Sequence, residues 1–254
     1  MRRLEHKVIL LAGAGGIGNG LAERFCAEGA RVVVGDMSLD RAEEAAARAR
    51  HGGGIAEALV LDGADEDSAR AAVAHCRGLH GGLDGLHANF ASMADCDPGK
   101  SVIDLPYAVL DEVYRVNARG YFTCTRAALP ALIERGGGSI VYTSSAAAYN
   151  SGGGQVAYAM SKAAIHALMR HVARRFGPDA IRANAIAPAL TLHPANEALV
   201  PEGMIESSLA KAALKARVGR PQDIAAIAAL LMAEDGAHIT GHVFNVDGGT
   251  IIRN

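Results

Sequence analysis

The chain has 254 residues, half of them hydrophobic, and 25 basic against 27 acidic residues give a formal net charge of −2. Because it has no basic run and no interleaving of aromatic and basic residues, a nucleic-acid surface is not expected. No apolar run approaches the ~20 residues that span a bilayer, and the four cysteines are scattered without a CxxC pair. We therefore expect a soluble cytoplasmic protein without structural disulfides.

Apolar runs alternate with segments of helical period along the chain. We expect strands near residues 8–11, 31–34, 58–61, 84–87, 139–143, 181–186 and 242–246, with helices such as 17–28 and 40–50 between them. Uniformly apolar strands separated by helices predict an α/β fold, a Rossmann-type doubly wound sheet of about seven parallel strands with helices on both faces. We expect one domain over residues 1–254, in which residues from about 190 to 215 form a mobile substrate lid.

A glycine-rich loop follows the first expected strand. Residues 13–18 read Gly-Ala-Gly-Gly-Ile-Gly and contain the G-x-G-x-x-G spacing. Glycines at this spacing permit a tight turn and let backbone N–H groups approach a pyrophosphate at the N-terminus of the next helix. The spacing alone is also compatible with a plain strand-to-helix turn.

Asp36 favours the dinucleotide interpretation of this loop. It ends the second expected strand eighteen residues after Gly18, where a carboxylate can accept hydrogen bonds from the hydroxyls of an adenine ribose. The same carboxylate would repel a 2′-phosphate, and no arginine immediately follows it, so NAD is favoured over NADP. The alternative is that Asp36 simply caps the next helix.

Tyr158 and Lys162 are four residues apart, and Ser145 lies thirteen residues before Tyr158. Positions i and i+4 share one face of a helix, so the ammonium group can lie beside the phenol. A tyrosine ordinarily titrates near pH ~10, but an adjacent positive charge stabilises the phenolate and lowers its pKa toward neutrality. The pair predicts a proton-transfer site, with a surface helix pair without chemistry as the alternative. The ten histidines form no grouping with metal-ligand spacing, so no metal site is expected.

Taken together and in this order, these motifs resemble the short-chain dehydrogenase/reductase family over the whole chain. Asp62, Asn89 and Asn117 fall at matching positions after the third strand, at the end of the fourth strand and in the Val-Asn-Ala-Arg-Gly segment. The resemblance implies a catalytic group of Asn117, Ser145, Tyr158 and Lys162. It also implies cofactor contacts from Gly13, Gly15, Ile17, Gly18, Asp36, Asp62, Gly63, Asn89, Tyr158, Lys162 and Thr191.

Three departures from the family pattern affect the expected cofactor contacts. The glycine loop is one residue shorter than is usual in the family, and Phe90 interrupts the run that is usually Asn-Asn-Ala-Gly. Ala189 stands where a glycine usually follows Pro188. None of these changes removes a catalytic group.

The resemblance implies hydride transfer between the nicotinamide of NAD(H) and the carbon of a secondary alcohol or ketone. Tyr158 would act as acid or base, and Ser145 would hydrogen-bond the substrate oxygen. Lys162 would bind the nicotinamide ribose, and Asn117 would hold a helical kink and a relay water. An NADP(H)-dependent carbonyl reductase and a non-catalytic NAD(H)-sensing protein of the same fold remain alternatives.

The substrate is not readable from the sequence. Its pocket should draw on residues 90–104, 147–155 and 190–215. The last of these segments carries apolar residues that either contact a fairly apolar substrate or pack the lid onto the body, namely Leu192, Leu199, Met204, Ile205 and Leu209. His193 is either a substrate contact or a plain loop residue. The resemblance further implies a homotetramer, or a homodimer, with contacts through helices near residues 117–134 and 155–176.

Overall fold

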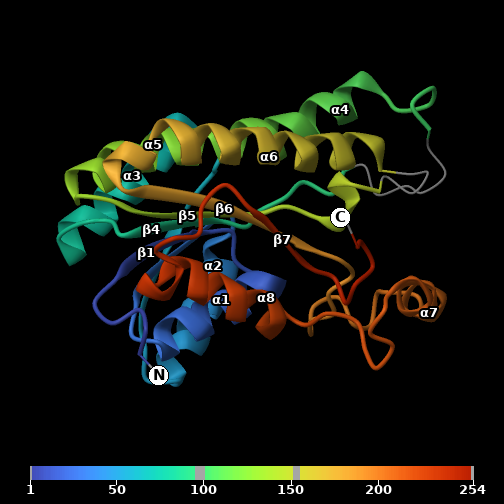
Figure 1. The fold of residues 1–254 in the computed structure, drawn as a ribbon, viewed down its shortest axis with the longest axis horizontal. Helices are drawn as coiled ribbons and strands as arrows, with labels where there is room; N and C mark the ends of the chain where they lie inside the picture. The colour runs from blue at the N-terminus through green and yellow to red at the C-terminus, as the bar shows by residue number, and fades with distance from the viewer. Residues whose placement is uncertain (1, 95–100, 151–154, 253–254) are drawn as a thin grey trace.

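Within residues 2–94, 101–150 and 155–252, which the computed structural model describes, seven parallel strands form one central sheet (Figure 1). They are β1 (Val8–Ala12), β2 (Arg31–Asp36), β3 (Ile55–Val60), β4 (Gly85–Ala88), β5 (Gly138–Thr143), β6 (Ile181–Pro188) and β7 (Val243–Val246). Their spatial order is β3-β2-β1-β4-β5-β6-β7, and every neighbouring pair is parallel. The predicted doubly wound α/β sheet is confirmed.

Helices cover both faces of this sheet (Figure 1). They are α1 (Gly16–Ala27), α2 (Leu39–His51), α3 (Glu66–His80), α4 (Tyr107–Tyr114), α5 (Gly120–Glu134), α6 (Val156–Arg175), α7 (Glu202–Lys211) and α8 (Pro221–Met232). In Figure 1 α3, α4, α5 and α6 lie on one face, α1, α2 and α8 lie on the other, and α7 stands apart near the C-terminal edge of the sheet.

The core divides into two clusters because strand residues alternate between the two faces. Leu10 and Leu86 belong to the cluster beneath α3, α5 and α6, whereas Ile9, Leu11 and Val141 belong to the cluster beneath α1, α2 and α8. Both faces of the inner strands are thus buried, which explains why their sequences are uniformly apolar.

The observed strand ends differ from the predicted ones by up to three residues, as in β3 and β6. β3 begins at Ile55 rather than at residue 58, and β6 continues to Pro188 rather than ending at residue 186. β3 is an edge strand, and its end residues Ile55 and Val60 are more than half exposed. Apolarity alone therefore does not mark its ends.

The order of the strands reverses between β1 and β4, which are neighbours although two strands separate them in the sequence. In open parallel sheets, ligands bind at the carboxyl edge beside such a reversal. The carboxyl ends of β1, β2 and β4 carry the glycine loop, Asp36 and Asn89 respectively. The fold therefore brings three of the predicted sites together.

In the described part of the chain no helix is long and apolar enough to cross a membrane. Cys26, Cys76 and Cys124 are buried free thiols, and burial raises the pKa of each to about 12. Cys96 lies outside the described residues, as do parts of two expected substrate segments, 95–100 and 151–154.

Candidate active site

The glycine loop makes a turn that side chains would block. Gly13 has φ +106°, and a Cβ placed on it would lie 2.5 Å from the backbone nitrogen of Phe90. A Cβ on Gly18 would lie 2.4 Å from the carbonyl oxygen of Gly13. Gly15 is the N-cap of α1 with φ 72°, and Ile17 packs partly buried against the core beneath α1. The first turn of α1 thus begins directly at the carboxyl edge of β1, with its N–H groups facing that edge.

Asp36 ties the glycine loop to the beginning of α2. Its Oδ2 accepts a hydrogen bond from Ala14 N at 3.0 Å, and its Oδ1 accepts one from Ser38 N at 2.9 Å. The N-cap of α2 is Ser38, whose side chain accepts from Arg41 N, so Asp36 is not the cap. The Arg41 guanidinium lies 2.7 Å from Asp36 Oδ1 through Nη2. Although no arginine immediately follows Asp36 in the sequence, the first turn of α2 brings one back to it.

A cavity of about 280 Å³ lies beside Asp36 at the point where the strand order reverses. Its lining includes five of the predicted cofactor residues, Gly13, Asp36, Asp62, Gly63 and Asn89. Arg41 also lines it. Asp62 Oδ1 accepts a hydrogen bond from Ala64 N at 2.9 Å, which fixes the turn after β3.

Phe90 finds its room in a slot between two glycines. A Cβ at Gly63 would lie 2.4 Å from Phe90 Cζ, and one at Gly120 would lie 2.8 Å from Phe90 Cε2. The ring also contacts the Tyr121 ring, with 4.9 Å between the centroids. Gly63 therefore has a packing role in addition to lining the cavity.

Lys162, the residue of the predicted catalytic group that carries a charge, is deeply buried. It lies on α6 with 1% of its surface exposed. Its Nζ donates to Thr143 O at 2.9 Å and to Tyr121 Oη at 3.2 Å. Burial lowers the pKa of Lys162 to about 7. Nζ also lies 5.7 Å from the centroid of the half-buried Tyr158 ring, so the predicted ammonium–phenol neighbourhood is present.

Asn117 and Ser145 are the other two members of the predicted catalytic group. Asn117 is fully buried in a short π-helix, η1 (Arg115–Arg119), and its Nδ2 donates to Ser161 Oγ at 3.1 Å. Its Oδ1 accepts from Ser92 N at 2.7 Å. Ser145 follows β5 and caps the 3₁₀ turn η2 (Ala146–Ala148), with its Oγ accepting from Ala147 N at 3.1 Å. Asn117 thus joins η1 to the residue next to Lys162 on α6.

A hydrogen-bonded chain connects the glycine loop to β5. Asn89 Nδ2 donates to Gly13 O at 3.1 Å, and Asn89 Oδ1 accepts from Thr143 Oγ1 at 2.9 Å. Thr143 Oγ1 lies 2.9 Å from His87 Nε2. Since the Thr143 hydroxyl donates its proton to Asn89 Oδ1, it can only accept from His87, which must therefore carry its proton on Nε2. Burial lowers the pKa of His87 to about 3, so the ring is neutral.

Thr191 and His193 lie in the segment that follows β6. The Thr191 hydroxyl donates to Ala189 O at 3.1 Å, and the residue forms a parallel bridge with Gly219. His193 instead lies over the glycine loop, where a Cβ on Gly16 would be 2.7 Å from His193 Nε2. Burial lowers the pKa of His193, and among the described residues its buried Nδ1 has no hydrogen-bond partner.

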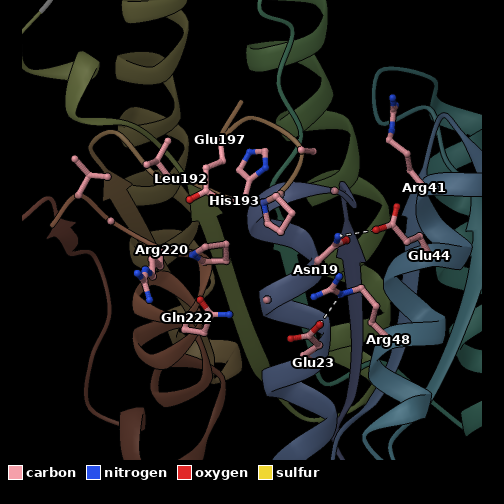
Figure 2. A pocket seen from close by; sticks show the side chains of 18 of the residues that line it. Asn19, Glu23, Arg41, Glu44, Arg48, Leu192, His193, Glu197, Arg220 and Gln222 are labelled. Atoms are coloured by element: carbon pink, nitrogen blue, oxygen red, sulfur yellow. Dashed lines mark hydrogen bonds and ion pairs between the residues drawn. The ribbon is translucent and has the colours of Figure 1, made fainter. Parts of the chain in front are cut away.

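Figure 2 shows the second cavity, of about 460 Å³, into which His193 points. It extends from the glycine loop between the outer faces of α1 and α2 and the segments at residues 192–197 and 217–222. Its polar side chains are partly paired, as in the ion pair of Glu23 with Arg48 at 2.6 Å. The two cavities share Arg41 and adjoin at the loop.

Four residues at this edge are not identified by the sequence analysis as part of the cofactor or proton-transfer site. They are Arg41, His87, Tyr121 and His193. The sequence gives a weak indication for Arg41, since it lies in the first turn of the helix that follows Asp36. A histidine inside an otherwise apolar strand is a signal for His87, but its hydrogen-bond partner Thr143 lies 56 residues away. No local pattern indicates Tyr121, whose hydroxyl partner Lys162 is 41 residues distant.

The arrangement combines a cavity of about 280 Å³, a carboxylate beside it and a buried ammonium next to a phenol. A family model described as Enoyl-(Acyl carrier protein) reductase matches residues 11–250. A probable short-chain type dehydrogenase/reductase of Bradyrhizobium diazoefficiens is 37% identical over 252 residues, 99% of this chain and 89% of that protein. The 7alpha-hydroxysteroid dehydrogenase of Bacteroides fragilis is 31% identical over 256 residues, 100% of this chain and 98% of that protein.

A solved structure of a short-chain dehydrogenase/reductase from Burkholderia xenovorans has the same fold. The two superpose with a TM-score of 0.91 over 100% of both chains, at 28% sequence identity. The family model and the relatives span nearly the whole chain, and the fold agrees with them throughout. The chain belongs to the short-chain dehydrogenase/reductase family of oxidoreductases.

Proposed function

We propose that the protein is an NAD(H)-dependent oxidoreductase that moves a hydride between nicotinamide and the carbon of a secondary alcohol or ketone. The observation that carries this proposal is the Lys162 ammonium, buried and held 5.7 Å from the centroid of the Tyr158 ring. A cation fixed in a dry environment stabilises a phenolate far more than one in water.

The residues present fit a nicotinamide dinucleotide. The cavity of about 280 Å³ has a carboxylate, Asp36, at the carboxyl end of β2, where ribose hydroxyls can donate to it. The first turn of α1 suits a diphosphate, because N–H groups at the start of a helix lack the usual intrahelical acceptors. Gly18 N is an exception, since it donates to Gly15 O at 2.6 Å. His193 lies against the same turn and is a candidate neighbour of the diphosphate. When bound, the nicotinamide accepts or supplies the hydride.

The chain's own residues would handle the proton and the substrate oxygen. In the oxidative direction, Tyr158 takes the hydroxyl proton at Oη and Ser145 hydrogen-bonds the same oxygen. Lys162 would stabilise the phenolate, and its remaining N–H would be available to a ribose hydroxyl of the cofactor. Asn117 acts through position, because its amide joins η1 to Ser161 beside Lys162.

Tyr158→Phe tests the assignment directly. It is expected to lower turnover by about 10²–10⁴-fold and to leave NADH binding nearly unchanged, since it removes only the phenolic oxygen. Turnover is followed by NADH absorbance and binding by NADH fluorescence. Tyr107→Phe, at a residue 83% exposed, serves as the control and should keep wild-type turnover. A Tyr158→Phe protein that keeps more than about a tenth of the wild-type rate would refute the assigned role.

Arg41 favours a second candidate, an NADP(H)-dependent carbonyl reductase. Its guanidinium lines the ribose cavity and lies 2.7 Å from Asp36, where it could receive a 2′-phosphate if it left that carboxylate. Fluorescence titration with NADH and with NADPH separates the two. Under our proposal NADH binds more tightly than NADPH, and Asp36→Asn reduces the ratio of the two affinities. Preference for NADPH that is lost in Arg41→Ala would establish the alternative.

A non-catalytic NAD(H)-sensing protein is the alternative from a different class. It would bind NADH tightly and turn over none of a panel of secondary alcohols and ketones. The panel should include hydroxysteroids and acyl thioesters, in view of the hydroxysteroid dehydrogenase relative and the description of the family model. Turnover on any member of the panel that Tyr158→Phe abolishes argues against the sensor.

We further propose that residues from about 190 to 215 close over a fairly apolar substrate. In this segment α7 has no fully buried residue, and Leu199 and Met204 are 79% and 53% exposed. Exposure of these side chains supports a role at a ligand more than a role in packing the lid onto the body. A single domain over residues 1–254, a homotetramer or homodimer, and a cytoplasmic location are proposed on the family resemblance.

A further inference from the structure

Tyr121 lies at the inner side of Lys162, where neither the motifs nor the proposed mechanism assigns it a role. It is the second residue of α5 and is fully buried. Its hydroxyl oxygen lies 2.9 Å from Phe90 O, 3.0 Å from Thr143 O and 3.2 Å from Lys162 Nζ. The hydroxyl therefore joins the segment after β4, the end of β5 and the α6 lysine.

The chemistry of these partners fixes the orientation of the hydroxyl. Both carbonyl oxygens can only accept, so the single phenolic proton goes to one of them. An ammonium group can only donate, so the Tyr121 oxygen accepts from Lys162. Burial, followed by the influence of Tyr158 and Cys124, raises the pKa of Tyr121 well above its ordinary value, which keeps the hydroxyl neutral.

The Lys162 ammonium has three N–H donors. Two of them are given to Thr143 O and Tyr121 Oη. Within the described part of the chain the third has no protein acceptor, which leaves it for the cofactor side of the site. The Tyr121 ring adds to this arrangement, because Nζ lies 4.9 Å from its centroid.

We propose that Tyr121 is a positioning residue for proton transfer: its neutral hydroxyl holds the Lys162 side chain in its charged form beside Tyr158. This role rests on the proposed function, since it matters only if Lys162 supports a phenolate. Without an acceptor at this place, the buried ammonium would keep one carbonyl partner and would lose its proton more readily.

Other titratable groups lie near the contact between Tyr121 and Lys162, and the structure relates them to Tyr121 or Cys124. Tyr158 on α6 and Cys124 on α5 both contribute to the raised pKa of Tyr121. Burial raises the pKa of the Cys124 thiol to about 12. The negative charge of Asp62 contributes to the raised pKa of the Cys124 thiol. The cause of the lowered Lys162 pKa is burial. Against this effect of burial, the Tyr121 hydroxyl accepts a hydrogen bond from Lys162 Nζ at 3.2 Å and so favours the charged form of the lysine.

The test compares Tyr121→Phe with Tyr142→Phe. The first keeps the ring against Lys162 and removes only the oxygen. The second removes another fully buried hydroxyl from the same cluster, one that is bonded to Thr125 Oγ1 at 2.9 Å. Each variant keeps its ring and removes one fully buried phenolic oxygen, but only Tyr121→Phe removes a hydrogen bond to Lys162.

The readout is the titration of Tyr158, measured without any substrate. Absorbance at the phenolate band is recorded against pH for each protein and for its Tyr158→Phe counterpart, and the difference isolates Tyr158. Tyr121→Phe should raise the midpoint by about one pH unit, because a lysine that is less often charged stabilises the phenolate less. Tyr142→Phe should leave the midpoint in place.

A Tyr121→Phe midpoint equal to that of the wild type, with a melting temperature lowered as in Tyr142→Phe, would reduce Tyr121 to a structural residue. Turnover is measured separately with the panel above, where Tyr121→Phe should slow the reaction about ten-fold near neutral pH. A wild-type protein without turnover would contradict the proposed function, while the comparison of midpoints would still decide the role of Tyr121.

Discussion

At the scale of single residues, Lys162 combines full burial with a charge that the proposed chemistry requires. Its ammonium has lost its hydration and receives in return one carbonyl and one hydroxyl oxygen. Taking an ion out of water costs several kcal/mol, which two hydrogen bonds offset only in part. Under the proposed function, this loss of stability is what it costs to hold a charge beside Tyr158.

Replacing this lysine should therefore stabilise the fold near neutral pH. Lys162→Met is expected to raise the free energy of unfolding by about 1–3 kcal/mol at pH 7. The folded pKa is about 7 and lies below the ordinary value of 10.5, so the unfolded chain binds more protons between these values. Wild-type stability should rise with pH across this window, and the advantage of the variant should shrink accordingly.

Urea denaturation at pH 7 and pH 10 measures this difference. Lys211→Met, on the exposed side of α7, is the control and should change stability by less than about 0.5 kcal/mol. An advantage of Lys162→Met that stayed constant from pH 7 to pH 10 would contradict the explanation by burial of charge.

At the scale of elements, β4 and β5 are joined by a buried histidine. The neutral His87 ring donates to Thr143, which in turn donates to Asn89 beneath the glycine loop. The folded pKa is about 3, below the ordinary value of 6.5, so this contribution to stability is complete above pH 6.5. It is lost as the pH falls toward 3, with a slope of about 1.4 kcal/mol per pH unit.

His87→Gln should remove this slope, because an amide can donate to Thr143 but does not titrate in this range. The variant is expected to be less stable than wild type at pH 7 and to lose less stability between pH 6 and pH 4. Chemical denaturation at several pH values provides the measurement. His51→Gln, at an exposed residue of α2, should keep the wild-type slope. Equal acid slopes in wild type and His87→Gln would rule out His87 as the cause.

The Phe90 slot gives a second prediction at this scale, because it joins α5 to the turns after β3 and β4. Gly63→Ala should lower stability by about 1–3 kcal/mol, since the new methyl group would overlap the ring. In a Phe90→Leu background the same change should cost much less. Gly78→Ala in α3, where a Cβ meets nothing within 4 Å, should instead stabilise by about 0.5–1 kcal/mol. A double-mutant cycle without coupling between residues 63 and 90 would contradict the slot.

At the scale of the whole molecule, both cavities lie at the carboxyl edge of the sheet. The segment that we propose as a lid includes α7, which stands apart near that edge (Figure 1). Local stability is low where few side chains are buried, and α7 buries none completely. Residues 192 and 193, which precede it, line the cavity beside the glycine loop. Ligand binding at the loop should therefore order the chain that follows.

Limited trypsin digestion measures this coupling at Lys211, Lys215 and Arg217. Saturating NADH should slow cleavage at these sites by at least several-fold, because binding shifts the population toward the closed segment. Cleavage of the denatured protein, with and without NADH, controls for effects on trypsin itself. A rate at these three sites that NADH leaves unchanged would count against a cofactor-linked lid.

The periodic parts of the fold were predictable from the sequence, and the lateral contacts of the site were not. Apolar runs such as Val8–Ala12 mark inner strands because both faces are buried, whereas β3 lies at the edge and its ends carry no such signal. The positions of Asp36 and Lys162 follow from the ends of strands and from helical spacing. The Arg41, His87 and Tyr121 contacts depend on side-chain directions across neighbouring elements, which residue spacing does not encode.

The backbone and the side chain of Thr143 hold two different parts of the site. Its carbonyl oxygen holds Lys162 and its hydroxyl holds Asn89. A carbonyl belongs to every residue type, so no point substitution at this position can delete the lysine's anchor, whereas the hydroxyl is lost with most replacements. Sequence changes at residue 143 during evolution would thus keep the hydrogen bond from Lys162 to the backbone carbonyl. The same changes could remove the hydrogen bond to Asn89 and so alter the support of the glycine loop.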